Sequence, residues 1–215
     1  MVDISKNLNS KRFLLTYLVI IGLLLMLWAI NIRLLHEDNR EIPFELLAYL
    51  ESPPREAPDL SLMLNSKQVL TNNWLKNKWS IVYFSHGNCL PLCRPALETM
   101  ELIKSSFTNN DFQFLVIDLD GDNETQSKLT SLLADQQFNF EVASASSAKI
   151  EDLAREFKAL FLKTRLSDGG YLIEQEHHLF VIDPKGRLYA TFKPPFRVSI
   201  QEDVSNMRYF YARTE

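Results

Sequence analysis

Apolar residues recur along this chain with two different spacings, and each spacing predicts one kind of element. Dense β-branched and aromatic runs are typical of buried strands, whereas apolar residues three and four positions apart are typical of amphipathic helices. The runs predict strands over 79–85, 112–118 and 138–144. The helical spacing predicts helices over 93–107, 125–135 and 148–160.

The last part of the chain predicts a hairpin followed by a helix. The segments "HHLFVID" and "RLYATF" flank Asp183-Pro184-Lys185-Gly186, which has Pro and Gly where a type I turn prefers them. An amphipathic segment begins at about Ser199. The whole order alternates strands with helices, which predicts an α/β domain with helices on a central, mostly parallel sheet. This layout is similar to that of thioredoxin-like domains.

The N-terminal part of the chain predicts a membrane anchor. Residues 13–32, "FLLTYLVIIGLLLMLWAINI", contain no charged residue, and a helix of that length spans about 30 Å, the thickness of the hydrocarbon core of a bilayer. Bulky residues follow the run where a signal peptidase needs small ones, so we expect it to stay uncleaved. The predicted organisation is an N-terminal segment over 1–12, the anchor over 13–32, a proline-containing stalk over 33–57 and the thioredoxin-like domain over 58–215.

Charge predicts how the anchor is oriented. Lys6, Lys11 and Arg12 precede the apolar run, while the segment after it mixes both signs. The positive-inside rule then predicts a cytoplasmic N-terminus and an exterior domain, which in a bacterium means the inner membrane and the periplasm. The chain carries a net charge of −4, and because its first twelve residues contribute +2, the remainder carries −6. This acidic balance argues against nucleic-acid binding.

The two cysteines of the chain, Cys89 and Cys93, lie in the loop between the first predicted strand and its helix. Open α/β sheets tend to place their chemistry at this carboxyl edge, and a helix N-terminus favours the thiolate form of a cysteine. Three interpretations stay open: a static disulfide, a redox couple, or two thiolates that bind Cu(I). A disulfide that closes so short a loop stabilises the folded state little. A structural zinc site needs four ligands.

A family resemblance narrows these alternatives. The stretch "WSIVYFSHGNCLPLCRPALETM", with "FLVIDLDGDNET" and "YLIEQEHHLFVIDPKGRL" after it, resembles the Sco/SenC proteins, which are membrane-anchored copper chaperones of cytochrome c oxidase assembly. The resemblance implies Cu(I) held by Cys89 and Cys93. It also implies a partner, either the copper-bearing subunit of the oxidase or another copper-assembly protein. Pro91 and Pro95 depart from the usual places of the prolines in this loop.

The third copper ligand of that family is a histidine, and the matching position in this chain is Gln175. Because strand side chains alternate, His177 shares a face with Gln175 and His178 faces the other way. We expect His177 to be the third ligand, with His178 as an alternative and His86 as an outside candidate. Both His177 and His178 could instead be partly exposed residues at a strand edge. His36 lies at the membrane flank and has no expected role.

Two further functions remain open because they need no histidine ligand. A thiol–disulfide reductase would use Cys89 and Cys93 to keep the copper-site cysteines of the oxidase reduced. An assembly scaffold would not need the cysteines at all. The resemblance favours the metal carrier over an enzyme, and Gln175 in place of the usual histidine favours the reductase.

Overall fold

The computed structural model describes residues 14, 16–30, 44–107, 110–120, 123–167 and 169–214, without the side chains of 45 and 123–127. The chain divides into two compact units, Met1–Ile42 and Pro43–Glu215. The predicted N-terminal segment over 1–12 and His36 lie outside the described residues.

The described part of the first unit is a helix. Residues 14 and 16–30 are helical, and apolar side chains such as Leu18 and Leu24 are exposed. The predicted anchor also includes residues 13, 15, 31 and 32, which are not described. Within the described ranges, no helix combines the length and the apolar character that a membrane span requires.

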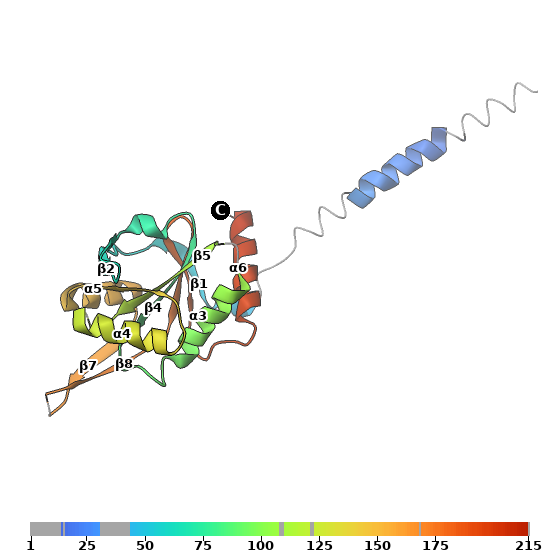
Figure 1. Cartoon of the computed structure of the whole chain (residues 1–215). Coiled ribbons are helices and arrows are strands. Elements are labelled where there is room, and N and C mark those ends of the chain that lie inside the picture. Colours follow the sequence, from blue (N-terminus) through green and yellow to red (C-terminus); the bar gives the residue numbers. More distant parts are fainter. Residues whose placement is uncertain are drawn as a thin grey trace, which may run out of the picture. The chain divides into compact units, whose positions relative to one another are not determined.

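The second unit alternates helices and strands around one large sheet (Figure 1). Its elements in chain order are α2 (Phe44–Leu47), β1 (Leu50–Glu56), β2 (Leu62–Leu64), β3 (Val69–Leu70), the 3₁₀ helix η1 (Asn72–Leu75), β4 (Trp79–Ser85), α3 (Arg94–Ser106), β5 (Phe112–Asp118), α4 (Asn123–Asp135), β6 (Glu141–Ser144), α5 (Ser147–Phe157), β7 (Phe161–Arg165), β8 (Tyr171–Gln175), β9 (Leu179–Ile182), β10 (Arg187–Phe192) and α6 (Ile200–Thr214). The strands predicted over 79–85 and 112–118 are confirmed residue for residue, whereas β1, β2, β3, β7 and β8 were not predicted.

The sheet has the strand order β1-β10-β9-β4-β5-β6-β2-β3. Strand β5 runs parallel to β4 and to β6, and the other pairs in this sheet are antiparallel. The prediction of a mostly parallel sheet is therefore wrong. A parallel pair needs a long crossover connection. Such crossovers join only β4 to β5, through α3, and β5 to β6, through α4.

Side chains of β4 alternate between two covered faces of the sheet. Val82 and Phe84 belong to a buried core that also contains Leu153 and Phe157 of α5. On the opposite face, Trp79 packs against a tyrosine of α6 at a ring separation of 4.9 Å. This alternation places the odd-numbered residues of β4 on the side of α6 and the even-numbered ones on the side of α5.

The predicted boundary between stalk and domain lies too far along the chain. Strand β1 falls inside the predicted stalk over 33–57, yet it pairs with β10 at the edge of the sheet. Pro53 and Pro54 favoured a stalk in the sequence because proline cannot donate to a strand ladder. An edge strand tolerates proline, since one side of it needs no partner.

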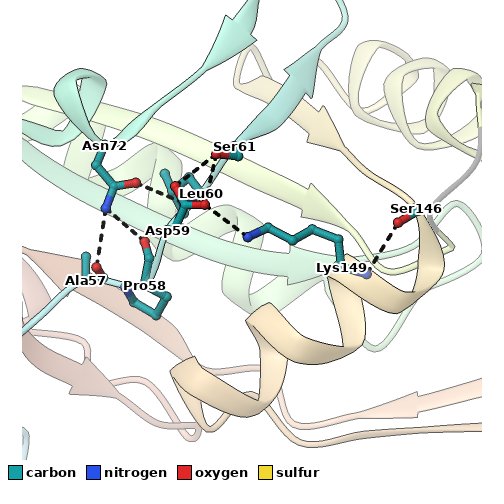
Figure 2. Close-up of polar contacts among 8 residues, drawn as sticks. All are labelled: Ala57, Pro58, Asp59, Leu60, Ser61, Asn72, Ser146 and Lys149. Carbon is teal, nitrogen blue, oxygen red and sulfur yellow. Dashed lines mark hydrogen bonds and ion pairs between the residues drawn. The ribbon is translucent and has the colours of Figure 1, made fainter.

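The residues that follow β1 are also fastened to the domain (Figure 2). The side chain of Asn72 donates to the carbonyl of Pro58 at 3.1 Å and accepts from the amide of Leu60 at 2.9 Å. Lys149 of α5 lies 3.3 Å from the carboxylate of Asp59. The hydroxyl of Ser61 and then Lys149 lower the pKa of Asp59. The predicted boundary at residue 58 thus cuts through a hydrogen-bonded segment.

Candidate redox and metal site

The cysteine loop connects the carboxyl end of β4 to the N-terminus of α3. Cys89 and Cys93 form a disulfide with an S–S distance of 1.97 Å and a Cα–Cα distance of 5.4 Å. Cys93 is the N-cap residue of α3, and its amide donates to the carbonyl of Cys89 at 3.2 Å. The structure therefore brings the two cysteines together at the predicted edge of the sheet.

Gly87 allows this loop to lie directly against α4. A Cβ atom at Gly87 would come within 2.7 Å of Cβ of Lys128 and 3.3 Å of the amide nitrogen of Leu129. Both contacts are closer than carbon side chains normally tolerate, and neither involves the flexible end of a side chain. The loop is thus positioned by close backbone packing rather than by its own hydrogen bonds alone.

A cavity of about 530 Å³ opens beside the disulfide. One wall is the cysteine loop, residues 86 and 88–92, and the other is formed by residues 171–175 and 177. Cys89 lines this cavity, whereas Cys93 is fully buried and is not among the lining residues. Leu92 also lines the cavity and is 72% exposed. The disulfide thus borders the cavity on the side of Cys89, and both cysteines are buried, with exposed fractions of 3% and 0%.

The second wall belongs to an antiparallel ribbon, β7 and β8, which projects from the rest of the domain (Figure 1). Polar contacts fasten its base to the rest of the domain. Gln175 donates from Nε2 to the main-chain carbonyl of Phe84 at 2.7 Å, and Lys163 lies 3.3 Å from the carboxylate of Asp120. These contacts join the ribbon to the end of β4 and to the segment after β5.

His177 and His178 line different cavities, as predicted, but both lie in the connection between β8 and β9 rather than on a strand, so strand alternation is not the cause. Nδ1 of His177 lies 2.6 Å from the hydroxyl of Tyr83, and His177 lines the cysteine cavity. His178 instead lines a different cavity together with Glu176 and Phe180. Its Nε2 lies 3.5 Å from the carboxylate of Glu176. His178 therefore does not face the cysteines, and the structure gives it no part in this site.

The electrostatics of the cavity favour neutral side chains. Burial lowers the pKa of His177, and the neighbouring His178 lowers it further. Burial also lowers the pKa of His86, although Asp120 acts in the opposite direction. Burial raises the pKa of Tyr83, so its hydroxyl keeps its proton at neutral pH. Both imidazoles are therefore neutral at neutral pH, the form in which histidine binds metals.

The atoms near the cavity are of the types that bind a soft metal ion, but they are not arranged to bind one. Two cysteine sulfurs and an imidazole nitrogen are the ligand types that Cu(I) prefers. Across the residues that the structure describes, no three His, Cys, Asp or Glu side chains are grouped closely enough to hold a metal ion. The sulfurs are bonded to each other here, so the disulfide must be reduced before they can act as thiolate ligands.

Polar residues of β4 that support the site were not predicted from the sequence. Tyr83 and Ser85 stand two residues apart on one face of β4 and are both fully buried. The hydroxyl of Ser85 donates to Sγ of Cys89 at 3.2 Å. A signal was available, because a serine and a tyrosine at alternate positions of a buried strand need polar partners inside the protein.

Similar structures support the thioredoxin-like fold. Arabidopsis thaliana ScoI with copper bound superposes with a TM-score of 0.64 at 20% identity, over 72% of this chain and 99% of that chain. BsSco, for which a disulfide switch is described, superposes with a TM-score of 0.59 at 16% identity, over 72% and 92%. The thioredoxin domain of a Bacteroides vulgatus thiol-disulfide oxidoreductase gives 0.51 at 13% identity, over 73% and 94%. The predicted thioredoxin-like sheet with flanking helices is confirmed.

Sequence relatives point the same way. The SCO2-like protein RC0895 of Rickettsia conorii is 21% identical over 180 residues, which cover 81% of this chain and 87% of the relative. The mitochondrial SCO1 homolog 2 of Arabidopsis thaliana is 21% identical over 139 residues, which cover 61% of this chain and 49% of the relative. The model of the SCO1/SenC family matches residues 50–206, and the chain therefore belongs to the SCO1/SenC family.

Proposed function

We propose that this protein is a membrane-anchored copper carrier that serves the assembly of cytochrome c oxidase. One observation carries the proposal: Cys89 and His177 line the same cavity, and Cys93 is bonded to Cys89. Membership of the SCO1/SenC family supports it. So do the copper-bound ScoI structure and the description of the BsSco family as cytochrome c oxidase assembly proteins.

Copper loading begins with reduction of the disulfide. A dithiol reductant would supply the two electrons and two protons that convert the Cys89–Cys93 disulfide into two thiols, and would itself be oxidised to a disulfide. The two thiols would lose their protons on binding Cu(I). The N-terminal N–H groups of α3 favour negative charge on the sulfurs. His177 supplies a neutral nitrogen from the ribbon side of the cavity. Cys89, Cys93 and His177 form the proposed ligand set.

The proposal also includes a membrane anchor and the location of the domain. The charge-free run over 13–32, preceded by Lys6, Lys11 and Arg12, supports a single-pass anchor in a bacterial inner membrane with a cytoplasmic N-terminus. The domain after it then lies in the periplasm. There it would meet its partner, the copper-bearing subunit of the oxidase or another copper-assembly protein.

A thiol–disulfide reductase is the second candidate, and one observation favours it. Cys89 and Cys93 are joined, and Cys89 lines the cavity whereas Cys93 does not. In the reduced protein, the thiolate of Cys89 would be placed to attack a disulfide of the partner and form a mixed disulfide, and Cys93 would then attack Cys89, which releases the reduced partner cysteines and forms the Cys89–Cys93 disulfide again. A reductase needs no histidine ligand. It would keep the copper-site cysteines of the oxidase reduced rather than carry the metal.

A Cu(I) competition titration against a chromophoric chelator separates the two functions. The full-length chain in detergent is reduced and titrated anaerobically, beside His177→Ala and the Cys89→Ser/Cys93→Ser double variant. His178→Ala is the matched control, because His178 faces a different cavity. Tight one-to-one binding that weakens in His177→Ala but not in His178→Ala supports the carrier. Weak binding that neither histidine affects refutes it, and rapid exchange with a cysteine-containing peptide would then establish the reductase.

A further inference from the structure

Every residue of strand β8, Tyr171–Gln175, lines the cavity beside Cys89, whereas the residues of β7 do not line it. Side chains of a strand alternate between its two faces, so one face alone presents only every second residue. An unbroken run of lining residues therefore means that the cavity borders the edge of β8 that points away from β7. The cysteine loop forms the wall opposite this edge.

The hydrogen bonds at the two ends of the ribbon show which main-chain groups lie on this edge. The amide of Leu166 donates to the carbonyl of Gly170 at 2.8 Å, and the amide of Glu176 donates to the carbonyl of Leu160 at 3.0 Å. Hydrogen-bonded and non-hydrogen-bonded pairs alternate along an antiparallel ladder, so the even-numbered residues of β8 bond to β7. The N–H and C=O groups of Ile173 therefore point away from β7, toward the cavity.

This edge of β8 is fixed in place but has no strand beside it. Among the residues that the structure describes, β8 pairs only with β7. The side chain of Ile173 is buried in the core, and that of Gln175 donates to the carbonyl of Phe84. A strand that is held in this way and has an unpaired edge is a template for another extended chain.

We propose that the edge of β8 docks an extended, cysteine-containing segment of a partner protein, which adds to the ribbon as a third strand and passes beside Cys89. The cavity indicates the chemistry of this segment. Leu92 and Leu172 line the cavity from its two walls and are both exposed, which favours apolar residues next to the cysteine. Glu174 is exposed and also lines the cavity, which favours a basic residue in the segment over an acidic one.

A single segment fits this place better than a second copy of the chain. A second copy would have to bring its own β8 against this one, and a cysteine loop lies across the cavity from each of these edges. The cavity, about 530 Å³, has the size of a small-ligand pocket, which suits a short extended stretch rather than a folded sheet. The inference rests on the proposed function in one respect, that a cysteine of the partner meets Cys89.

Disulfide exchange in Cys93→Ser measures docking without copper. The full-length variant in detergent is first joined to glutathione through Cys89. A peptide thiolate then attacks this disulfide and releases glutathione as a thiol, so one disulfide breaks and one forms. The probe is the peptide acetyl-Lys-Val-Cys-Leu-Thr-amide. The equilibrium constant of the exchange compares this peptide with glutathione at the same sulfur.

Peptides that lack one N–H group distinguish strand addition from contact through side chains. An ester in place of one amide removes a donor without adding bulk, and it is placed either at the residue after the cysteine or at the next one. Successive N–H groups of a strand point to opposite edges, so only one of the two can face β8. We expect one ester to lower the exchange constant by about fivefold, the usual effect of one hydrogen bond, and the other to leave it unchanged. Equal effects of the two esters, or none, overturn the proposal.

Amide hydrogen exchange locates the added strand. The amide of Ile173 should exchange about tenfold more slowly with the peptide attached than with glutathione attached. The amide of Lys163 points to the far edge of β7 and is the matched control, which should keep its rate. An unchanged rate at Ile173, or slowing at Lys163 instead, overturns the proposal. Slow exchange at Ile173 without peptide, in a chain that sediments as a dimer, assigns the edge to a second copy and also overturns it.

A pair of leucine variants tests the same edge from the side of the protein. Leu172→Ala should lower the exchange constant by about threefold, because it removes apolar surface that the peptide would bury. Leu162→Ala changes an exposed leucine of β7 that does not line the cavity, and it should have no effect. Equal exchange constants in the two variants contradict docking at β8. A chain that binds no Cu(I) refutes the carrier alone, because these measurements use no copper.

Discussion

The side chain of Gln175 donates a hydrogen bond to the main-chain carbonyl of Phe84 at 2.7 Å, across 91 positions of sequence. Gln175 stands where the family resemblance places a copper-binding histidine. In this chain it fastens the projecting ribbon to the end of β4 instead. His177, two residues further on, reaches the cysteine cavity from the same side. Gln175 therefore holds the ribbon, and His177 faces the cysteine cavity.

Gln175→Glu should destabilise the domain while leaving the size of this side chain unchanged. A carboxylate cannot donate to the carbonyl of Phe84, so two acceptors would face each other in a part-buried place. We expect a loss of about 1–3 kcal/mol in the free energy of unfolding, measured by urea denaturation. Glu174→Gln changes an exposed neighbour on the same strand and should have little effect. Equal stabilities of the two variants would contradict this role of Gln175.

Gly87→Ala should cost stability through the packing of the cysteine loop on α4. The added Cβ would lie 2.7 Å from Cβ of Lys128, so the loop or the helix must move. Overpacking of this kind typically costs about 1–3 kcal/mol in the free energy of unfolding. Asn88→Ala, at an exposed position of the same loop, is the control and should stay within about 0.5 kcal/mol of the unmodified chain. A Gly87→Ala variant as stable as the control would show that the loop adapts freely.

Cys89 should react several-fold faster than Cys93 in the reduced protein. Cys89 lines the cavity, whereas Cys93 is fully buried at the start of α3, and alkylation requires access to the sulfur. Brief treatment with iodoacetamide, followed by proteolysis and mass spectrometry, measures the two rates. The fast reaction should persist in Cys93→Ser and disappear in Cys89→Ser. Faster labelling of Cys93 would show that reduction rearranges the loop.

The stability of the oxidised chain should fall as the pH drops from 7.5 to 5.5. Burial lowers the pKa values of His177 and His178 in the folded state. The unfolded chain therefore binds protons at a higher pH than the folded chain does. Above the ordinary pKa of histidine, about 6.5, these two residues are neutral in both states and the free energy of unfolding keeps its full value. As the pH falls from there through the lowered pKa values, the unfolded chain takes up protons first and the free energy of unfolding declines.

Urea denaturation at both pH values measures this decline. His178→Gln replaces one of the two histidines with a side chain that does not titrate, and it should make the decline shallower. Lys193→Gln removes a positive charge that also lowers the pKa of His178, so it should reduce the decline by a smaller amount. A decline as steep in His178→Gln as in the unmodified chain would exclude His178 as a contributor.

The sequence by itself determined the buried centre of the fold and the place of the cysteines. Strands β4 and β5 match their predictions because a strand covered on both faces needs an unbroken apolar run, and that requirement is visible locally. The cysteine loop follows from the same run, since it begins where the apolar residues end. The apolar spacings that predicted α3 and α5 can likewise be seen in the local sequence.

The edges of the sheet and the connections of the site were decided only by the tertiary structure. β1 contains prolines, and β7 and β8 are largely exposed, so none of them carries the apolar pattern of a buried strand. Their pairing, and the antiparallel direction of most strands, depend on which segments meet in space. The contact of Tyr83 with His177 spans 94 positions. Residues that far apart have no common local period, so only the folded chain can place one against the other.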